Sequence, residues 1–254
     1  MKKISLFTFM MLAVLFLNSC ASKLDYVYLN GNSLPIKTSD YEIKLQADDV
    51  LMISVTSVNP EVALPYNLQV LNIQNDSDLG IGQQTRLNYL ITKEGTIEFP
   101  VLGTIDLKGL TRIEAQQKIR DLLIDHIADA NVILKVMNFK ITVLGEVNKP
   151  GTIQVKSERI SVLEAIGSAG DLSIFGKRDN ILLIRERDGQ TITQRLDLTD
   201  INLISSPYYY LAQNDVLYVE PNKTKINSSA VGPNISIGIS AISLLITIIA
   251  LTTR

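Results

Sequence analysis

The chain has 254 residues, with 24 Lys and Arg against 26 Asp and Glu, one His, one Cys and no Trp. This length suits one or two small domains with a buried core, and the scattered, near-neutral charge excludes a basic face for nucleic acid. A single cysteine excludes an internal disulfide, and a single histidine excludes a His-rich metal site.

The N-terminus has the layout of a secretory signal, with two lysines before an uncharged apolar run from Ile4 to Leu17. The run ends at Leu17-Asn18-Ser19-Cys20, which contains the only cysteine and resembles the lipobox of bacterial lipoproteins. We therefore expect residues 1–19 to be a cleaved signal peptide and Cys20 to carry acyl chains such as palmitate. The alternative is an ordinary signal peptide whose cysteine falls near the cut by chance.

Residues 20–40 are polar and contain Gly31 and Pro35, so we predict a tether that leads into a first module at residues 41–137. A capping box, Thr111-Arg112-Ile113-Glu114, predicts the start of a helix. The turn residues Lys93–Gly95 predict a hairpin between the two strands around them. The strands expected in this module are Tyr41–Leu45, Val50–Val58, Leu87–Thr92, Thr96–Val101 and Val132–Val136.

A second module is predicted at residues 138–222, with a helix that begins at the capping box Ser161–Glu164. Its expected strands are Lys140–Leu144, Ile181–Arg185, Thr191–Asp197 and Val216–Val219. The segments Leu45–Ile53 and Leu211–Val219 match in pattern, which indicates that the two modules share a plan. The predicted fold class is therefore α+β, with two small mixed-sheet modules in the middle of the chain.

Residues 232–254 are predicted to form a C-terminal transmembrane helix, because no charge occurs between Lys225 and Arg254. At 100° per residue, four hydroxyl side chains fall on one stripe of this helix. They are Ser236, Ser240, Ser243 and Thr247. The stripe has two compatible interpretations: close association between helices, or the lining of a water-filled lumen at the centre of a helical ring.

Motifs for catalysis or metal binding do not occur in this sequence, so we predict neither an enzyme nor a cofactor or metal site. His126 follows the first capped helix, where an imidazole suits the helix dipole. Asp48, Asp49 and Asp215 stand at the entries of the matched strands, and we interpret them as turn residues rather than as paired catalytic carboxylates. Tyr208–Tyr210 is the one aromatic run; strand packing is a simpler interpretation than sugar stacking.

Several motifs between Tyr41 and Pro221 jointly resemble the outer-membrane polysaccharide export family, the Wza-like lipoproteins. Gly95-Thr96-Ile97, Phe99-Pro100 and Leu102-Gly103 resemble its export domain. Val143-Leu144-Gly145-Glu146-Val147, Pro150-Gly151 and Ser161–Ile166 resemble its soluble-ligand-binding (SLBB) β-grasp module. The chain departs from the family pattern at Glu94 and Asp171, and it contains one β-grasp module where longer relatives stack two or more.

The resemblance implies a homo-oligomeric ring, with C-terminal helices forming an α-barrel, that exports capsular or extracellular polysaccharide. It implies an inner-membrane polysaccharide co-polymerase as a partner and a lipid-anchored position in the outer membrane, with the body in the periplasm. It also favours the lumen interpretation of the hydroxyl stripe. The alternative function is a periplasmic carbohydrate- or protein-binding scaffold lipoprotein whose terminal helix is only an anchor.

Overall fold

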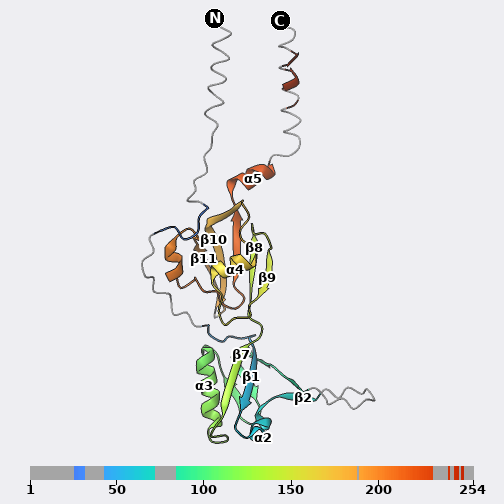
Figure 1. Cartoon of the computed structure of the whole chain (residues 1–254), viewed down its shortest axis with the longest axis vertical. Coiled ribbons are helices and arrows are strands. Elements are labelled where there is room, and N and C mark those ends of the chain that lie inside the picture. The colour runs from blue at the N-terminus through green and yellow to red at the C-terminus, as the bar shows by residue number, and fades with distance from the viewer. Residues whose placement is uncertain are drawn as a thin grey trace, which may run out of the picture.

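The computed structural model describes residues 26–31, 43–71, 84–187, 189–230, 240, 243–245 and 247–248. In it, an export module (residues 43–137) and an SLBB module (residues 138–222) follow one another along the long axis of the molecule (Figure 1). Each module is named after the family domain that its sequence resembles. The α+β class is confirmed. The signal peptide (residues 1–19), Cys20 and Ser236 lie outside the described residues.

The export module is built on an antiparallel three-stranded sheet with the strand order β4-β1-β7. One face of the sheet, the helix α3 and the hairpin β5–β6 share a core that includes Leu51, Ile53, Leu107, Ile119 and Leu134. The elements of this module are β1 (Val50–Thr56), α2 (Pro60–Ala63), η2 (Leu64–Tyr66), β2 (Gln69–Leu71), β3 (Gln84–Arg86), β4 (Tyr89–Leu90), β5 (Thr96–Phe99), β6 (Gly103–Asp106), α3 (Arg112–Leu123) and β7 (Asn131–Val136).

The predicted hairpin around Lys93–Gly95 is wrong in its pairing. A tight turn does form there, since the Thr92 and Gly95 amides donate to Thr96 and Thr92 carbonyls at 2.9 Å. However, β4 pairs with β1, and β5 pairs with β6 in a hairpin that turns one strand later. Tyr89 and Phe99 stack in the core with ring centroids 5.4 Å apart, so packing rather than a ladder joins β4 to β5.

The first predicted strand, Tyr41–Leu45, is also not confirmed over its described part. Residues 43–45 contain only an isolated bridge between Lys44 and Thr111. The Leu45 amide donates to the Leu110 carbonyl at 2.8 Å, and the Leu45 carbonyl accepts from the Gly109 amide at 3.0 Å. These bonds attach the entry segment to the loop before α3 instead of to the sheet.

The SLBB module is built on a mixed five-stranded sheet, β11-β10-β12-β8-β9, in which only β12 and β8 are parallel. Gly145 is required at the end of β8, because it has a φ of +88° and a Cβ there would lie 2.1 Å from the Val219 carbonyl oxygen. The elements are β8 (Lys140–Gly145), β9 (Gly151–Gln154), α4 (Val162–Ser168), β10 (Gly176–Arg187), β11 (Gln190–Leu196), η3 (Ile201–Ser205), β12 (Val216–Pro221) and, after the module, α5 (Lys223–Ala230).

Both capping boxes form as predicted. The Thr111 hydroxyl accepts from the Glu114 amide at 3.2 Å, and the Glu114 carboxylate accepts from the Thr111 amide at 2.8 Å. Ser161 and Glu164 repeat the arrangement at 3.2 and 2.7 Å. Each box satisfies backbone donors at a helix start that would otherwise have no partner.

Candidate functional site

The two matched segments form the same turn at the entry of β1 and of β12. Asp48 and Asn214 have φ angles of +68° and +65°. The carboxylate of the next residue then accepts a hydrogen bond from the backbone amide three residues earlier. Asp49 accepts from Gln46 at 3.0 Å, and Asp215 accepts from Ala212 at 2.7 Å. Short polar side chains tolerate this left-handed conformation, which explains the shared sequence pattern. The turn role predicted for these aspartates is therefore what the geometry shows.

The two turns lie on either side of the segment that joins the modules. The Asn138 side chain accepts from the Val50 amide and donates to the Asp48 carbonyl, both at 2.9 Å. On the other side, the Gln213 side chain donates to the Asn138 carbonyl at 2.9 Å and accepts from the Lys140 amide at 2.8 Å. Side-chain amides thus connect the two repeated turns through the linker. An ion pair between Arg112 and Glu158 at 3.1 Å adds a second contact between the modules.

The two turn aspartates differ in what balances their charge. Asp215 is fully buried and forms a two-pronged ion pair with Arg185, whose Nε and Nη2 approach the carboxylate at 2.9 and 2.6 Å. Burial raises the pKa of Asp215, and the Arg185 guanidinium opposes that rise. Asp49 is buried without a cation, and its Oδ1 has no hydrogen-bond partner among the described residues. Burial raises the pKa of Asp49 to about 6.

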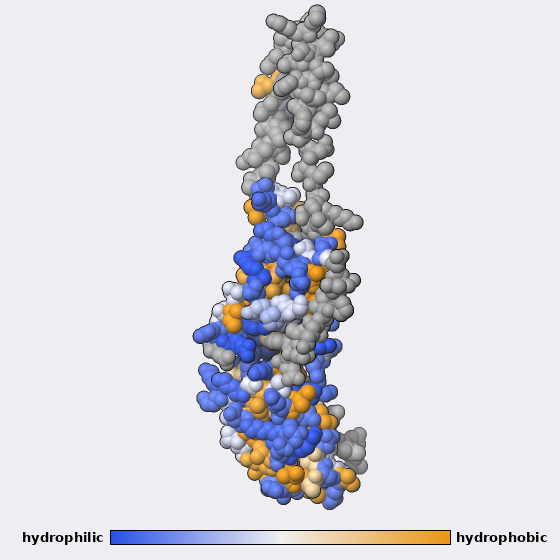
Figure 2. Space-filling view, turned by 90° about the vertical axis from the view of Figure 1, so that its left-hand side faces the viewer, coloured by the Kyte–Doolittle hydropathy of each residue, from blue (hydrophilic) through white to orange (hydrophobic). Residues whose placement is uncertain are grey.

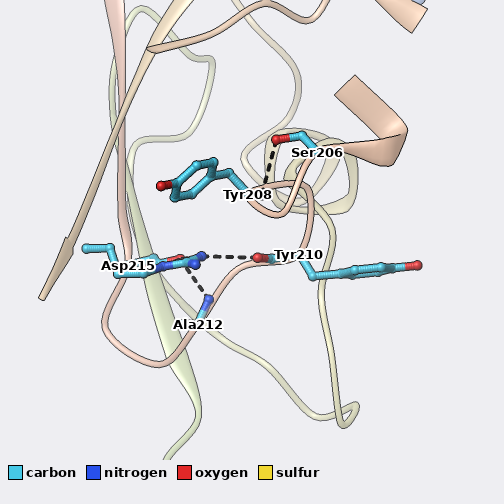
Figure 3. A network of polar contacts seen from close by, with 6 residues as sticks. Ser206, Tyr208, Tyr210, Ala212 and Asp215 are labelled. Carbon is cyan, nitrogen blue, oxygen red and sulfur yellow. Dashed lines mark hydrogen bonds and ion pairs between the residues drawn. The ribbon is translucent and has the colours of Figure 1, made fainter. Parts of the chain in front are cut away.

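The tyrosine run lies beside this ion pair: Tyr210 meets it through its backbone carbonyl, and its ring points away (Figure 3). Arg185 donates to the Tyr210 carbonyl at 3.1 Å and lies 5.7 Å from the centroid of the Tyr208 ring. The Tyr210 ring is buried, packs edge-on to Tyr209 and is covered by the Arg159 guanidinium at 4.9 Å. The run therefore packs on the SLBB core, as the simpler interpretation predicts, and does not present an open row of rings for stacking sugars.

Residues 26–31, within the predicted tether, are fastened to the SLBB module. The Leu29 and Asn30 amides donate to the Leu198 and Thr199 carbonyls at 2.9 and 2.5 Å. The Tyr28 hydroxyl donates to Asp171, and burial together with this carboxylate raises the pKa of Tyr28 to about 12. The Arg178 guanidinium lies over both the Tyr26 and Tyr28 rings. Sequence reasoning missed this contact, although the alternation Tyr26-Val27-Tyr28-Leu29 is a weak strand signal.

The structure describes three of the four hydroxyl residues of the predicted stripe. Ser240, Ser243 and Thr247 are exposed helical residues, and the Thr247 hydroxyl donates to the Ser243 carbonyl at 2.8 Å. This i to i−4 contact puts Ser243 and Thr247 on one helix face. Within the described ranges, no helix is both long enough and apolar enough to cross a membrane. Most of the predicted helix at residues 232–254 lies outside those ranges.

A catalytic or metal site does not emerge from the described residues. They contain no group of three His, Cys, Asp or Glu side chains that would hold a metal ion. His126 lies beside the Tyr66 ring, 5.9 Å between centroids, just after α3. Two surface depressions lie on the described residues, an open one of about 530 Å³ along α3 and a smaller one of about 180 Å³ beside η3.

Two family profiles match the chain in the order of the two modules. The family described as "Polysaccharide biosynthesis/export protein" matches residues 37–137, and the SLBB domain family matches residues 140–196. Over residues 37–137 the chain is therefore similar to a polysaccharide export family. This is an export family and not an enzyme family.

Two curated proteins that match the chain are also named as polysaccharide export proteins. The chain is 25% identical over 195 residues to the "EPS I polysaccharide export outer membrane protein EpsA" of Ralstonia solanacearum, covering 76% of this chain and 51% of the relative. It is 26% identical over 162 residues to the protein of the same name from Ralstonia nicotianae (strain ATCC BAA-1114 / GMI1000), covering 61% of this chain and 42% of the relative. The chain therefore spans about half the length of the curated relatives it matches.

Proposed function

We propose that this chain is a subunit of an oligomeric outer-membrane channel that exports capsular or extracellular polysaccharide from the periplasm. The observation that carries the proposal is the match to both family profiles, export then SLBB, in a chain whose relatives are named as outer-membrane export proteins. No covalent step is required of such a subunit. Its chemistry is to supply a hydrated path with weak, repeated contacts along which a polymer slides.

The two ends of the chain supply the proposed attachment to the membrane. Residues 1–19 act as a signal peptide, Cys20 carries the lipid, and residues 232–254 cross the outer membrane as a helix. The described segments nearest these ends, residues 26–31 and α5, both adjoin the SLBB module (Figure 1). Two or three acyl chains, at about 0.8 kcal/mol per buried methylene, hold a protein firmly at a bilayer. The body then lies in the periplasm, where an inner-membrane co-polymerase can deliver polymer.

In this proposal, Ser236, Ser240, Ser243 and Thr247 line the lumen formed by the C-terminal helices. A hydroxyl stripe offers hydrogen bonds to water and to sugar hydroxyls without binding either tightly. The 2.8 Å bond from Thr247 to the Ser243 carbonyl satisfies the Thr247 donor within the helix itself, so the side chain needs no partner from a neighbouring helix.

Secretion of polymer by cells that depend on this chain tests the proposal. Replacing Ser240 and Ser243 together by Leu should reduce secretion strongly, because bulky apolar side chains narrow and dry the path. Replacing both by Ala, which keeps the space, should have a smaller effect. Leu245→Ile is the matched control on the opposite face of the same helix.

Unchanged secretion in the Ser240→Leu/Ser243→Leu variant would show that the stripe does not line a lumen. The scaffold lipoprotein with an anchoring helix would then be the better account. Metabolic labelling with palmitate tests the anchor separately: the wild-type chain should be labelled, and Cys20→Ser should not.

A further inference from the structure

The export module presents two opposed outer faces. Its core lies between the inner face of the β4-β1-β7 sheet and the buried side of α3, which carries Ala115, Ile119 and Leu123. Side chains alternate along a strand and repeat every 3.6 residues in a helix, so the remaining faces of the sheet and of α3 point away from this core on opposite sides. We call these two surfaces the sheet face and the helix face.

The helix face combines apolar rims with a centre of charged and polar side chains. Ile113 and Ile124, 61% and 60% exposed, form one rim, and Leu122 forms the other. Glu114, Gln117, Lys118 and Asp121 lie between the rims and line the open depression of about 530 Å³ along α3. In Figure 2, which shows the molecule from the α3 side of Figure 1, apolar patches border a polar area on the export module.

The cations on α3 contact groups other than Asp121, although Lys118 lines the same depression. Arg120 donates to the Gln117 side chain at 3.1 Å. Lys118 donates to the Asp106 carbonyl of the β5–β6 hairpin at 2.7 Å, and Arg112 pairs with Glu158 of the SLBB module at 3.1 Å. Among the residues that the structure describes, Asp121 accepts a hydrogen bond from the Gln117 side-chain amide at 2.7 Å and forms no ion pair. Its carboxylate is exposed and can still accept hydrogen bonds from a cation on another molecule.

The sheet face also combines exposed apolar side chains with a charged one. Leu90 and Met137 are 58% and 50% exposed, and Ile133 and the partly buried Met52 continue the apolar surface across the strands. Lys135 is exposed between Ile133 and Met137 along the chain. Among the described residues, no carboxylate lies within ion-pair distance of its ammonium group. Lys135 is thus a cation beside exposed apolar side chains, opposite in charge to Asp121 on the helix face.

The geometry points to a head-to-tail contact in which the sheet face of one export module packs on the helix face of a second copy, with Lys135 paired to the neighbour's Asp121. This inference rests on the proposed oligomeric function, because it assigns the surfaces through which the copies meet. Two different faces on opposite sides of one module make a heterologous contact, which closes into a ring when the rotation between copies is suitable. The apolar rims supply the burial, and the charge pair sets the register.

Charge reversal in the full-length chain, extracted in non-ionic detergent and weighed by native mass spectrometry, tests this interface. Lys135→Asp and Asp121→Lys each place like charges opposite one another, so each should weaken the contact about tenfold and shift the population towards monomer. The double variant restores an attractive pair with reversed polarity and should recover the assembly. Lys93→Asp and Glu94→Lys, which alter exposed charges on the Thr92–Thr96 turn of the same module, are matched controls and should leave the assembly unchanged.

The outcomes separate this inference from the proposed function. If the wild-type chain assembles but the single reversals do not weaken it, or if the double variant fails to recover, this interface is wrong while the oligomeric channel stands. If the wild-type chain is monomeric, the oligomeric function itself fails. Circular dichroism on each variant checks that the fold is retained.

Cysteine cross-linking gives a second measurement that does not depend on charge. In a Cys20→Ser background, a chain carrying both Gln117→Cys and Ile133→Cys should form a ladder of disulfide-linked oligomers on oxidation. Either substitution alone should give little cross-linked product, because a heterologous contact places position 117 of one copy against position 133 of the next. Equal cross-linking by the single variants would overturn the assignment.

Discussion

Asp49 and Asp215 occupy equivalent turns, but only Asp215 has a buried cation beside it. A carboxylate that is removed from water without a cation favours its protonated form, which is why the pKa of Asp49 rises to about 6. Two backbone amides and the linker side chain of Asn138 hold the turn in place around it. Ionisation of Asp49 therefore destabilises the export module, at the turn that contacts the linker to the SLBB module.

Stability should depend on Asp49 between about pH 4 and pH 6. The pKa is higher in the folded chain than in the unfolded chain, so the stabilisation is fully present below about pH 4 and is lost as the pH rises through about 6. A shift of this size corresponds to about 2–3 kcal/mol. Urea unfolding across this range should show the loss in the wild type and a flatter profile in Asp49→Asn. Asp48→Asn, at the exposed neighbour, should keep most of the wild-type slope; an unchanged slope in Asp49→Asn would contradict the assignment.

Arg185 should be far more important to stability than its neighbours on the surface. Arg185→Ala leaves Asp215 buried without a partner and should lower the free energy of unfolding by about 3–5 kcal/mol. The exposed Arg187→Ala is the control and should change it by less than about 0.5 kcal/mol. Chemical denaturation of both variants measures the difference. Similar losses in the two variants would show that the ion pair is not what stabilises the 206–215 loop.

At the scale of single elements, the two capping boxes make the clearest energetic prediction. Thr111→Ala and Ser161→Ala each remove a side-chain acceptor from a helix start and should each cost about 1 kcal/mol in the free energy of unfolding. Thr111→Ser keeps the oxygen and should cost much less. A loss in Thr111→Ser as large as in Thr111→Ala would mean that the threonine methyl group, rather than the cap, is responsible.

The docked segment 26–31 is a second element with a testable contact. Tyr28→Phe removes the hydroxyl that donates to Asp171 but keeps the ring under Arg178. Hydrogen exchange at the Leu29 and Asn30 amides should then accelerate, because their bonds to Leu198 and Thr199 open more often. Exchange of the β10 amides is the internal control and should not change. Unaltered exchange at Leu29 and Asn30 would show that the backbone bonds alone hold the segment.

The elements that sequence reasoning recovers are those with strong local signals. Thr111 and Ser161 mark helix starts because a cap is a local interaction, and the predicted strands β7, β8, β10, β11 and β12 form. The strand β9 was not predicted. The pairing of β4 with β1 was not predictable, because a turn at Lys93–Gly95 does not decide which distant strand provides the hydrogen-bonding partner. The contact between Tyr28 and Asp171, 143 positions apart, is equally invisible to local patterns.

At the scale of the whole molecule, the matched segments Leu45–Ile53 and Leu211–Val219 form equivalent structures, as their similar sequences indicate. Both form a turn with a left-handed residue, and the turns meet at the linker through Asn138 and Gln213. The sequence could not show that Arg185, from a strand thirty positions earlier, would neutralise one turn and leave the other without a cation. This asymmetry depends on the tertiary arrangement of β10 and β12.

The proposed channel is most directly tested by the mass of the intact assembly. Native mass spectrometry of the full-length chain, extracted with its C-terminal segment and lipid anchor in place, should show a closed homo-oligomer of one defined size. Deletion of residues 232–254 should weaken that assembly without unfolding the two modules. A wild-type chain that is monomeric at every detergent concentration would contradict the account.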